Sequence, residues 1–116
     1  MASERRFDPR LPLEMYLNAY VADQPQRGFT TNISETGVHL NTLVDRPLPP
    51  FTPVGLEFNL PGLGETIWAA GEICFDSADD LFLGRGIRFT AMANLHARML
   101  RHYCYFARHP SMRPGV

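Results

Sequence analysis

The fold is decided by the stretch Phe29-Thr-Thr-Asn-Ile-Ser-Glu-Thr-Gly-Val-His-Leu-Asn-Thr42, in which two alternating runs flank a turn. Apolar and polar side chains alternate up to Ser34, which places Phe29, Thr31 and Ile33 on one face, and they alternate again from Val38 onward. A period of two residues is typical of a half-buried β-strand. The residues between the runs, Glu35-Thr-Gly37, have the composition of a tight turn. We therefore expect a β-hairpin.

The same period continues on both sides of this hairpin. Further alternating runs cover residues 13–21, 54–60, 67–75 and 81–89. Turn-forming residues separate them at Asp23–Gly28, Pro61–Gly64 and Ser77–Asp80. Four prolines between Pro47 and Pro53 lack the N–H that a ladder needs, so this segment is expected to be a stiff loop.

The period changes near the C-terminus, where apolar side chains recur at helical spacing at Met92, Leu95, Met99, Tyr103 and Phe106. This pattern predicts an amphipathic α-helix that ends before Pro110. Six strands followed by one helix predict a mainly β fold, a six-stranded antiparallel β-barrel with a C-terminal α-helix packed on it. We expect a flexible N-terminal arm at residues 1–12, the barrel and helix at 13–109, and a tail at 110–116.

The charge of the chain is nearly balanced but unevenly distributed. All 11 cationic side chains are arginines, and 12 acidic residues give a formal net charge of −1. Up to Asp80 there are five arginines and 12 acids, which gives −7, whereas six arginines and no acid follow Asp80, which gives +6. Domains that bind polyanions in general are usually strongly basic, so no nucleic-acid partner is expected.

Cysteine usage and hydropathy bear on localisation. Cys74 and Cys104 lie far apart and are too few for a disulfide framework, which indicates a reducing compartment. The N-terminus lacks the apolar core of a signal peptide, and no apolar run approaches the ~20 residues that span a bilayer. We expect a cytoplasmic protein without membrane insertion.

The sequence lacks patterns typical of catalytic or metal sites. The four histidines are His39, His96, His102 and His109. They form no H-E-x-x-H pattern, and no cysteine lies at ligand spacing from them. His102 borders the apolar helical stripe, where we expect a packed histidine rather than a ligand. Ser34 lacks the G-x-S-x-G context of a nucleophile elbow. We therefore expect no enzyme activity, no metal and no cofactor.

Two surface features allow more than one interpretation. Three arginines lie opposite the apolar stripe of the predicted helix, namely Arg98, Arg101 and Arg108. They form either a solvated face or a surface for an acidic partner. Trp68 lies on the outward face of its strand, where it either anchors a partner or packs beneath the terminal helix; we favour the second.

Two polar motifs belong together. Arg6-Phe-Asp-Pro-Arg10, with Arg5 directly before it, precedes the first strand, and Asn32-Ile-Ser-Glu-Thr-Gly37 leads from the second strand into the third. The chain here resembles the PilZ domain family. The family's R-x-x-x-R arm and [D/N]-x-S-x-x-G turn are matched at Arg6, Arg10, Asn32, Ser34 and Gly37. Gly71–Phe75 and Gly84–Phe89 are similar to its last two strands, and the resemblance covers residues 4–107.

This resemblance implies a barrel that binds cyclic di-GMP, a bacterial second messenger with two guanines and two phosphates. A guanidinium can form paired hydrogen bonds with guanine O6 and N7, bind phosphate oxygens or stack on a purine. The strand period predicts that Asn32 and Ser34 share an outward face, within reach of a guanine edge and a phosphate. Gly37 is expected to supply a positive φ or bare backbone where the ligand approaches closely. The arm is expected to order over the nucleotide.

The ligand-binding residues implied by the resemblance are Arg5, Arg6, Arg10, Asn32, Ser34 and Gly37. In the family, an arginine directly before the arm motif accompanies an intercalated pair of nucleotides, so Arg5 implies two ligands per chain. Two positions depart from the commonest pattern. Asn32 replaces the more usual aspartate and keeps an acceptor oxygen, and Phe75 stands where relatives often carry tryptophan.

The sequence therefore predicts a non-enzymatic, stand-alone cyclic di-GMP receptor. Ordering of the arginine arm is expected to relay the signal to a downstream protein partner, or to self-association, in motility, pilus function, biofilm formation or chemosensory control. The alternative is a PilZ-fold adaptor that acts on a protein partner without the nucleotide. The intact motifs count against this alternative, since an adaptor has no physical need for them.

Overall fold

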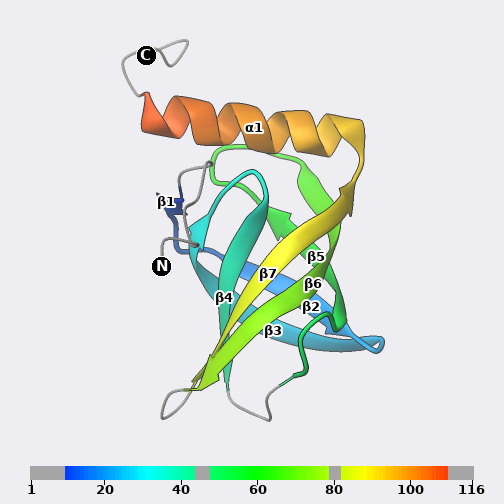
Figure 1. Ribbon diagram of the computed structural model, residues 1–116. Helices are drawn as coiled ribbons and strands as arrows, with labels where there is room; N and C mark the ends of the chain where they lie inside the picture. Colours follow the sequence, from blue (N-terminus) through cyan, green and yellow to red (C-terminus); the bar gives the residue numbers. More distant parts are fainter. Residues whose placement is uncertain (1–9, 44–47, 79–81, 110–116) are drawn as a thin grey trace, which may run out of the picture.

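A computed structural model describes residues 10–43, 48–78 and 82–109 and shows a mainly β structure beneath one long helix (Figure 1). The elements are β1 (Leu11–Pro12), β2 (Tyr16–Val21), β3 (Gln24–Ile33), β4 (Gly37–Leu43), β5 (Pro53–Asn59), β6 (Thr66–Ala78), β7 (Phe82–Met92) and α1 (Asn94–Arg108). Their order agrees with the predicted architecture.

Six of the strands close into a barrel. Their order is β3-β2-β5-β6-β7-β4, and β4 pairs back with β3, so that the ring has no open edge between them. All of these pairings are antiparallel. β1 is an additional short strand that pairs with the end of β3. The predicted six-stranded antiparallel barrel with a C-terminal helix is confirmed.

The predicted first strand, 13–21, begins three residues later than expected, at Tyr16, and the separate short strand β1 precedes it. Thr30 of β3 lies against residues 13–15, where its hydroxyl donates to the Leu13 carbonyl and accepts from the Met15 N–H. The backbone N–H of Thr30 also donates to the Met15 carbonyl, over 2.9 Å. A buried side chain thus replaces part of the strand ladder, and residues 13–15 form a link between β1 and β2.

The first turn is much shorter than Asp23–Gly28. Only Ala22 and Asp23 turn the chain, with positive φ angles of 52° and 64°, and Val21 already pairs with Gln24. Two residues with positive φ match the right-handed twist of a hairpin, which is why the turn is tight. Pro25 is tolerated within β3 because, among the described residues, pairing with β4 begins only at Gly28.

β3 contains a bulge that the alternation does not predict. Its pairing with β4 shifts register between Thr30 and Asn32. Thr30 and Ile33 are both fully buried, whereas Phe29 and Thr31 are half-buried, so the predicted common face of Phe29, Thr31 and Ile33 is wrong. The extra residue re-aims the strand end, which is a frequent role of bulges.

The barrel interior holds the core. Phe58 of β5 and Phe89 of β7 stack with ring centroids 6.4 Å apart. Phe58 is buried and Phe89 partly buried. Further fully buried side chains of the described barrel strands include Ile33, Val38, Leu40, Leu56, Ile67 and Ile73. No described helix is long and apolar enough to cross a membrane.

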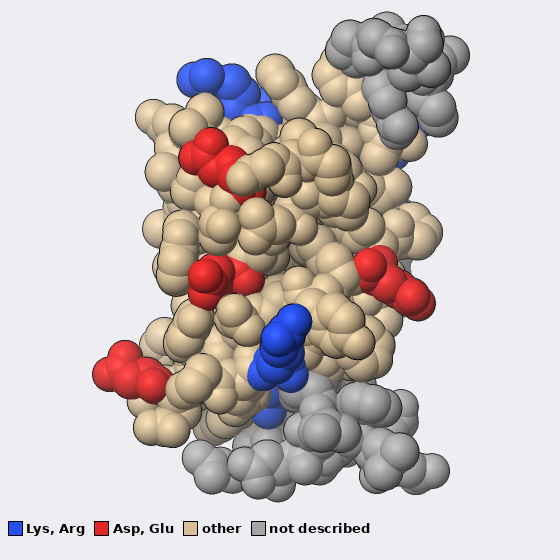
Figure 2. Space-filling model, turned by 180° about the vertical axis from the view of Figure 1, so that it is seen from behind, with Lys and Arg blue, Asp and Glu red and all other residues tan. Residues whose placement is uncertain are grey.

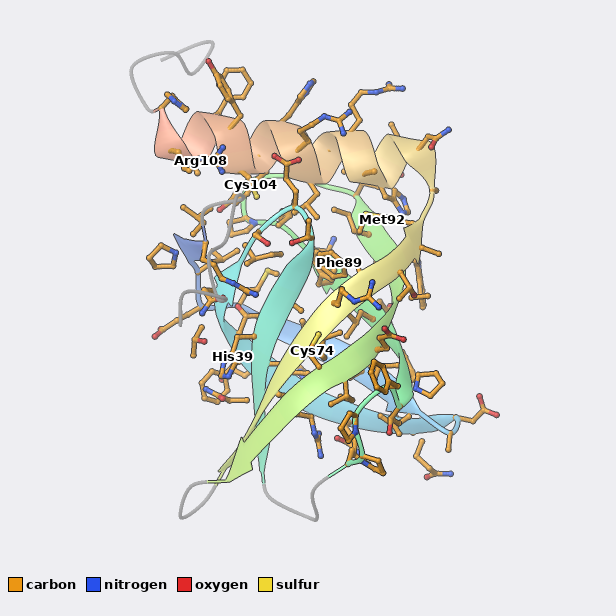
Figure 3. All side chains as sticks on the ribbon, in the orientation of Figure 1. His39, Cys74, Phe89, Met92, Cys104 and Arg108 are labelled. Carbon is orange, nitrogen blue, oxygen red and sulfur yellow. The ribbon has the colours of Figure 1, made fainter. Side chains whose placement is uncertain are left out.

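The face of α1 that packs on the barrel differs from the predicted stripe. Leu100 and Cys104 are buried, whereas Leu95 is 49% exposed and His102 is also exposed. Figure 3 shows Cys104 on the side of α1 that faces the barrel. The stripe is therefore rotated toward Leu100 and Cys104, and the expectation that His102 is packed is wrong. Met92 still belongs to β7.

Trp68 does not pack beneath the helix, because its side chain is 53% exposed on β6. Its backbone N–H instead donates to Nδ1 of His96, over 3.2 Å, and this bond ties the first turn of α1 to the sheet. Nε2 of the same histidine lies 3.6 Å from the Glu65 carboxylate.

Candidate functional site

The N-terminal arm motif and the turn motif meet at one edge of the barrel. Arg10 directly precedes β1, whose Leu11 and Pro12 pair with Ile33 and Asn32 of β3. This pairing brings the Arg10 guanidinium against the Asn32 side chain, with 2.8 Å between Arg10 Nη1 and Asn32 Oδ1. Two of the predicted site residues, 22 positions apart in the chain, are thus in direct contact.

The predicted residues Arg5 and Arg6 lie outside the described residues.

Asn32 begins a short network of polar side chains. Its Oδ1 accepts from Arg10, and its Nδ2 lies 3.5 Å from Oγ1 of Thr31, the bulged residue. That hydroxyl lies 2.9 Å from Nδ1 of His39. The network fixes the orientation of the Asn32 amide, because its oxygen faces a donor-only guanidinium.

His39 lies beside Arg10 and Asn32, although it belongs to neither motif and was not predicted as a binding residue. It pairs with Asn32 across β3 and β4, and its own neighbours Val38 and Leu40 point into the barrel, so its ring lies on the outer side. Figure 3 shows it on the side of the barrel where β1 lies. Burial lowers the pKa of His39 below its ordinary value, and the Arg10 guanidinium lowers it further. In the sequence, only the position of His39 within the predicted hairpin could have indicated that it lies close to Asn32.

Ser34 does not share the outward face of Asn32. It is only 1% exposed, and its Oγ lies 3.2 Å from the N–H of Thr36, which donates to it. Its backbone N–H donates to the Gly37 carbonyl, over 2.9 Å. The outward placement predicted for Ser34 is wrong, because β3 ends at Ile33 and Ser34 already belongs to the turn. Ser34 holds the turn together from inside.

Gly37 is required by packing within the barrel. A Cβ at this position would lie 2.5 Å from the Ile87 carbonyl oxygen of β7, closer than real contacts allow. Its φ is not among the positive angles of the described glycines, so the predicted positive φ is wrong. The close neighbour is the backbone of the protein itself. The N–H of Phe89 also donates to the Thr36 carbonyl, over 2.8 Å, and this bond anchors the turn to β7.

A cavity lies elsewhere in the described part of the chain. It has a volume of about 640 Å³ and lies between the turn at Pro61–Leu63 and α1. Its remaining lining residues are Met99, His102, Tyr103, Phe106 and Ala107. This lining is mostly apolar and includes no guanidinium or carboxamide, so it lacks the groups that recognise phosphates and base edges.

The back of the molecule carries scattered charges. Figure 2 shows acidic and arginine side chains that lie apart from one another on a mostly uncharged surface. On another part of the barrel, Arg88 of β7 forms an ion pair with Glu72 of β6. Among the described residues, no group of three or more histidine, cysteine, aspartate or glutamate side chains is placed to hold a metal ion.

The fold and the site together define a class of small closed barrels, in which an N-terminal arginine segment meets a polar strand end. The chain belongs to the PilZ domain family, because the model of the PilZ domain matches residues 4–106. No curated protein matches the chain in sequence.

Solved structures share the fold at low sequence identity. The Bacillus subtilis inhibitor of motility (MotI/DgrA) superposes with a TM-score of 0.81 at 16% identity, over 94% of this chain and 54% of that one. This chain thus spans about half the length of that protein. The PilZ domain of Escherichia coli YcgR with c-di-GMP has a TM-score of 0.73 at 15% identity, covering 92% and 94% of the two chains. K. pneumonia MrkH in its c-di-GMP complex gives 0.76 at 16% identity, covering 92% and 54%.

Proposed function

We propose that the protein is a non-enzymatic receptor for cyclic di-GMP. The observation that carries this proposal is the contact between Arg10 and Asn32, which joins the two motifs of the family in one place. Membership of the PilZ domain family supports it, as do the neighbours YcgR and MrkH, whose structures contain c-di-GMP.

The chemistry of the contact suits a cyclic dinucleotide. A guanidinium binds phosphate oxygens and the O6 and N7 edge of guanine through paired hydrogen bonds. One contact of the Arg10 guanidinium is with a neutral amide, which takes no positive charge away from it. An aspartate in place of Asn32 would neutralise part of that charge.

The arginine arm completes the proposed site. Arg5 and Arg6 precede Arg10 closely in the chain, and in our proposal they close over the nucleotide and bind its second face. Arg5 then recruits a second nucleotide, which gives two ligands per chain. In this proposal the ordered arm forms a changed surface that a downstream protein partner recognises in the cytoplasm.

Isothermal titration calorimetry with cyclic di-GMP tests the receptor function. The wild-type protein is expected to bind, and Arg10→Ala to weaken binding roughly 10- to 100-fold, since a charge-assisted hydrogen bond contributes about 1.5–3 kcal/mol. Arg10→Lys keeps the charge but loses the planar donor geometry and is expected to fall between the two. Arg98→Ala, at an exposed arginine of α1, is the matched control and should bind as the wild type does.

Two results would count against the proposal. If the wild-type protein shows no binding, the adaptor alternative is favoured, in which the fold serves a protein partner without the nucleotide. If Arg10→Ala and Arg98→Ala bind equally well, the site is elsewhere. A stoichiometry near one per chain, unchanged by Arg5→Ala, would remove the second ligand only.

A further inference from the structure

His39 stands next to the proposed nucleotide site without belonging to either motif. It lies directly opposite Asn32 in the ladder between β3 and β4. Its Nδ1 is linked through the Thr31 hydroxyl to the Asn32 amide, and the Asn32 amide contacts Arg10. An imidazole in this position is one hydrogen-bonded residue away from the groups that would contact the ligand.

The donor and the acceptor of each hydrogen bond in this network can be assigned by starting from Arg10. Arg10 can only donate, so Asn32 presents its oxygen to Arg10 and its NH₂ group to the Thr31 hydroxyl. The Thr31 hydroxyl then has its proton available for Nδ1 of His39, over 2.9 Å. This arrangement corresponds to a neutral imidazole that carries its proton on Nε2.

The charges around His39 favour this neutral form. On β4 its neighbours Val38 and Leu40 are apolar, and on β3 it faces Thr31 and Asn32, which do not titrate. Arg10 supplies a positive charge from the segment before β1, and it lowers the pKa of His39 in addition to the larger effect of burial.

On β7, Gly86 lies opposite His39. Arg85 beside it donates to the Gln26 side chain over 2.8 Å, and Arg88 further along is paired with Glu72 of β6. The charge that lowers the pKa of His39 is the cation of Arg10.

We propose that His39 is part of the nucleotide site and takes up a proton when the nucleotide binds. This inference rests on the proposed function. A ligand with two phosphates that binds at Arg10 brings negative charge to the cation that opposes protonation of His39. The imidazolium then adds a second cation beside the bound phosphates, and ligand affinity rises as the pH falls through the titration of His39.

Calorimetry in two buffers of different ionisation enthalpy, at about pH 6.5, measures the protons exchanged on binding. The wild-type protein is expected to take up a fraction of a proton per site and to bind more tightly at about pH 6 than at about pH 8, by at most about tenfold per pH unit. His39→Gln should bind without net uptake and with a flat pH profile. His102→Gln, at an exposed histidine of α1, should behave as the wild type.

NMR titration of the His39 ring in the wild-type protein provides a second readout that needs no variant. Its pKa is expected to rise when cyclic di-GMP is added. Binding without proton uptake, or uptake that persists in His39→Gln, overturns the role of His39 and leaves the receptor function intact. Absence of binding at every pH overturns the receptor function and this inference with it.

Discussion

Two regions of the molecule offer a ligand very different surroundings. The cavity between α1 and the turn at Pro61–Leu63 has a volume of about 640 Å³ and is lined mostly by apolar side chains. The site at Arg10 and Asn32 is a half-buried strand end, where a guanidinium, a carboxamide, a hydroxyl and an imidazole converge. Cavity size therefore does not locate this site, because a charged nucleotide requires groups that match its phosphates and base edges.

The two regions also differ in what holds them. α1 is attached mainly through apolar burial at Leu100 and Cys104. The turn after β3 is attached through hydrogen bonds of Ser34, Thr36 and Phe89 and through the close approach of Gly37 to β7. Truncation of a buried side chain of the helix should thus lower stability through lost apolar packing, whereas substitutions in the turn should lower it through lost hydrogen bonds or overpacking.

The largest effect is expected at the helix. Leu100→Ala should lower the free energy of unfolding by about 2–5 kcal/mol, because it leaves a cavity between α1 and the barrel. Leu95→Ala is the matched control on the exposed side of the same helix and should change stability by less than about 0.5 kcal/mol. Chemical denaturation measures both. Equal losses would contradict the observed orientation of α1.

Gly37→Ala should have the next largest effect. The added Cβ would lie 2.5 Å from the Ile87 carbonyl oxygen, so β4 and β7 must move apart. Such overpacking costs about 1–3 kcal/mol. Gly64→Ala is the control, since a Cβ there meets nothing within 4 Å. If thermal unfolding of the two variants is alike, the close packing at Gly37 is not what requires glycine.

Ser34→Ala should cost about 1 kcal/mol of stability, because the Thr36 N–H loses its acceptor inside the turn. Thr52→Ala is a control with an exposed hydroxyl, which donates to the Pro49 carbonyl. Denaturation curves compare the two. A Ser34→Ala variant that is as stable as the wild type would show that the buried hydroxyl does not organise the turn.

The smallest expected effect is on the pH dependence of stability, through His39. The pKa of His39 is lowered from 6.5 in the folded protein, so the unfolded chain binds the proton more readily. The contribution of His39 to stability is therefore fully present above about pH 6.5 and is lost as the pH falls toward its folded pKa. His39→Gln should lose less stability than the wild type between about pH 8 and about pH 5.5, measured by thermal unfolding. A larger loss in the variant would reverse the sign and contradict the burial of the neutral ring.

Much of the fold follows from the alternating pattern, because a strand with one buried face must repeat every two residues. The pattern could not show the bulge near Thr31, which puts Thr30 rather than Thr31 on the buried face. Nor could it show that β3 ends at Ile33, so that Ser34 lies buried in the turn and not on the outer face. The tight turn at Ala22 and Asp23 was missed for a different reason, because the nearby Pro25 and Gly28 carry stronger turn signals.

The candidate site was predictable where it depends on motifs and not where it depends on register. Arg10 and Asn32 were expected at the site because they match the two motifs of the family, and the structure brings them into contact. His39 carries no motif, and only the pairing of β3 with β4 places it opposite Asn32. At Gly37 the sequence does not show how closely β7 approaches, and this approach requires the bare backbone in the structure.

The central claim is that Arg10 and Asn32 act together as one nucleotide site. A double-mutant cycle with Arg10→Ala, Asn32→Ala and the double variant, followed by the calorimetric affinity for cyclic di-GMP, tests it most directly. We expect each single variant to bind more weakly, and the double variant to lose less than the product of the two single losses. Losses that multiply, or a single variant with wild-type affinity, would contradict the claim.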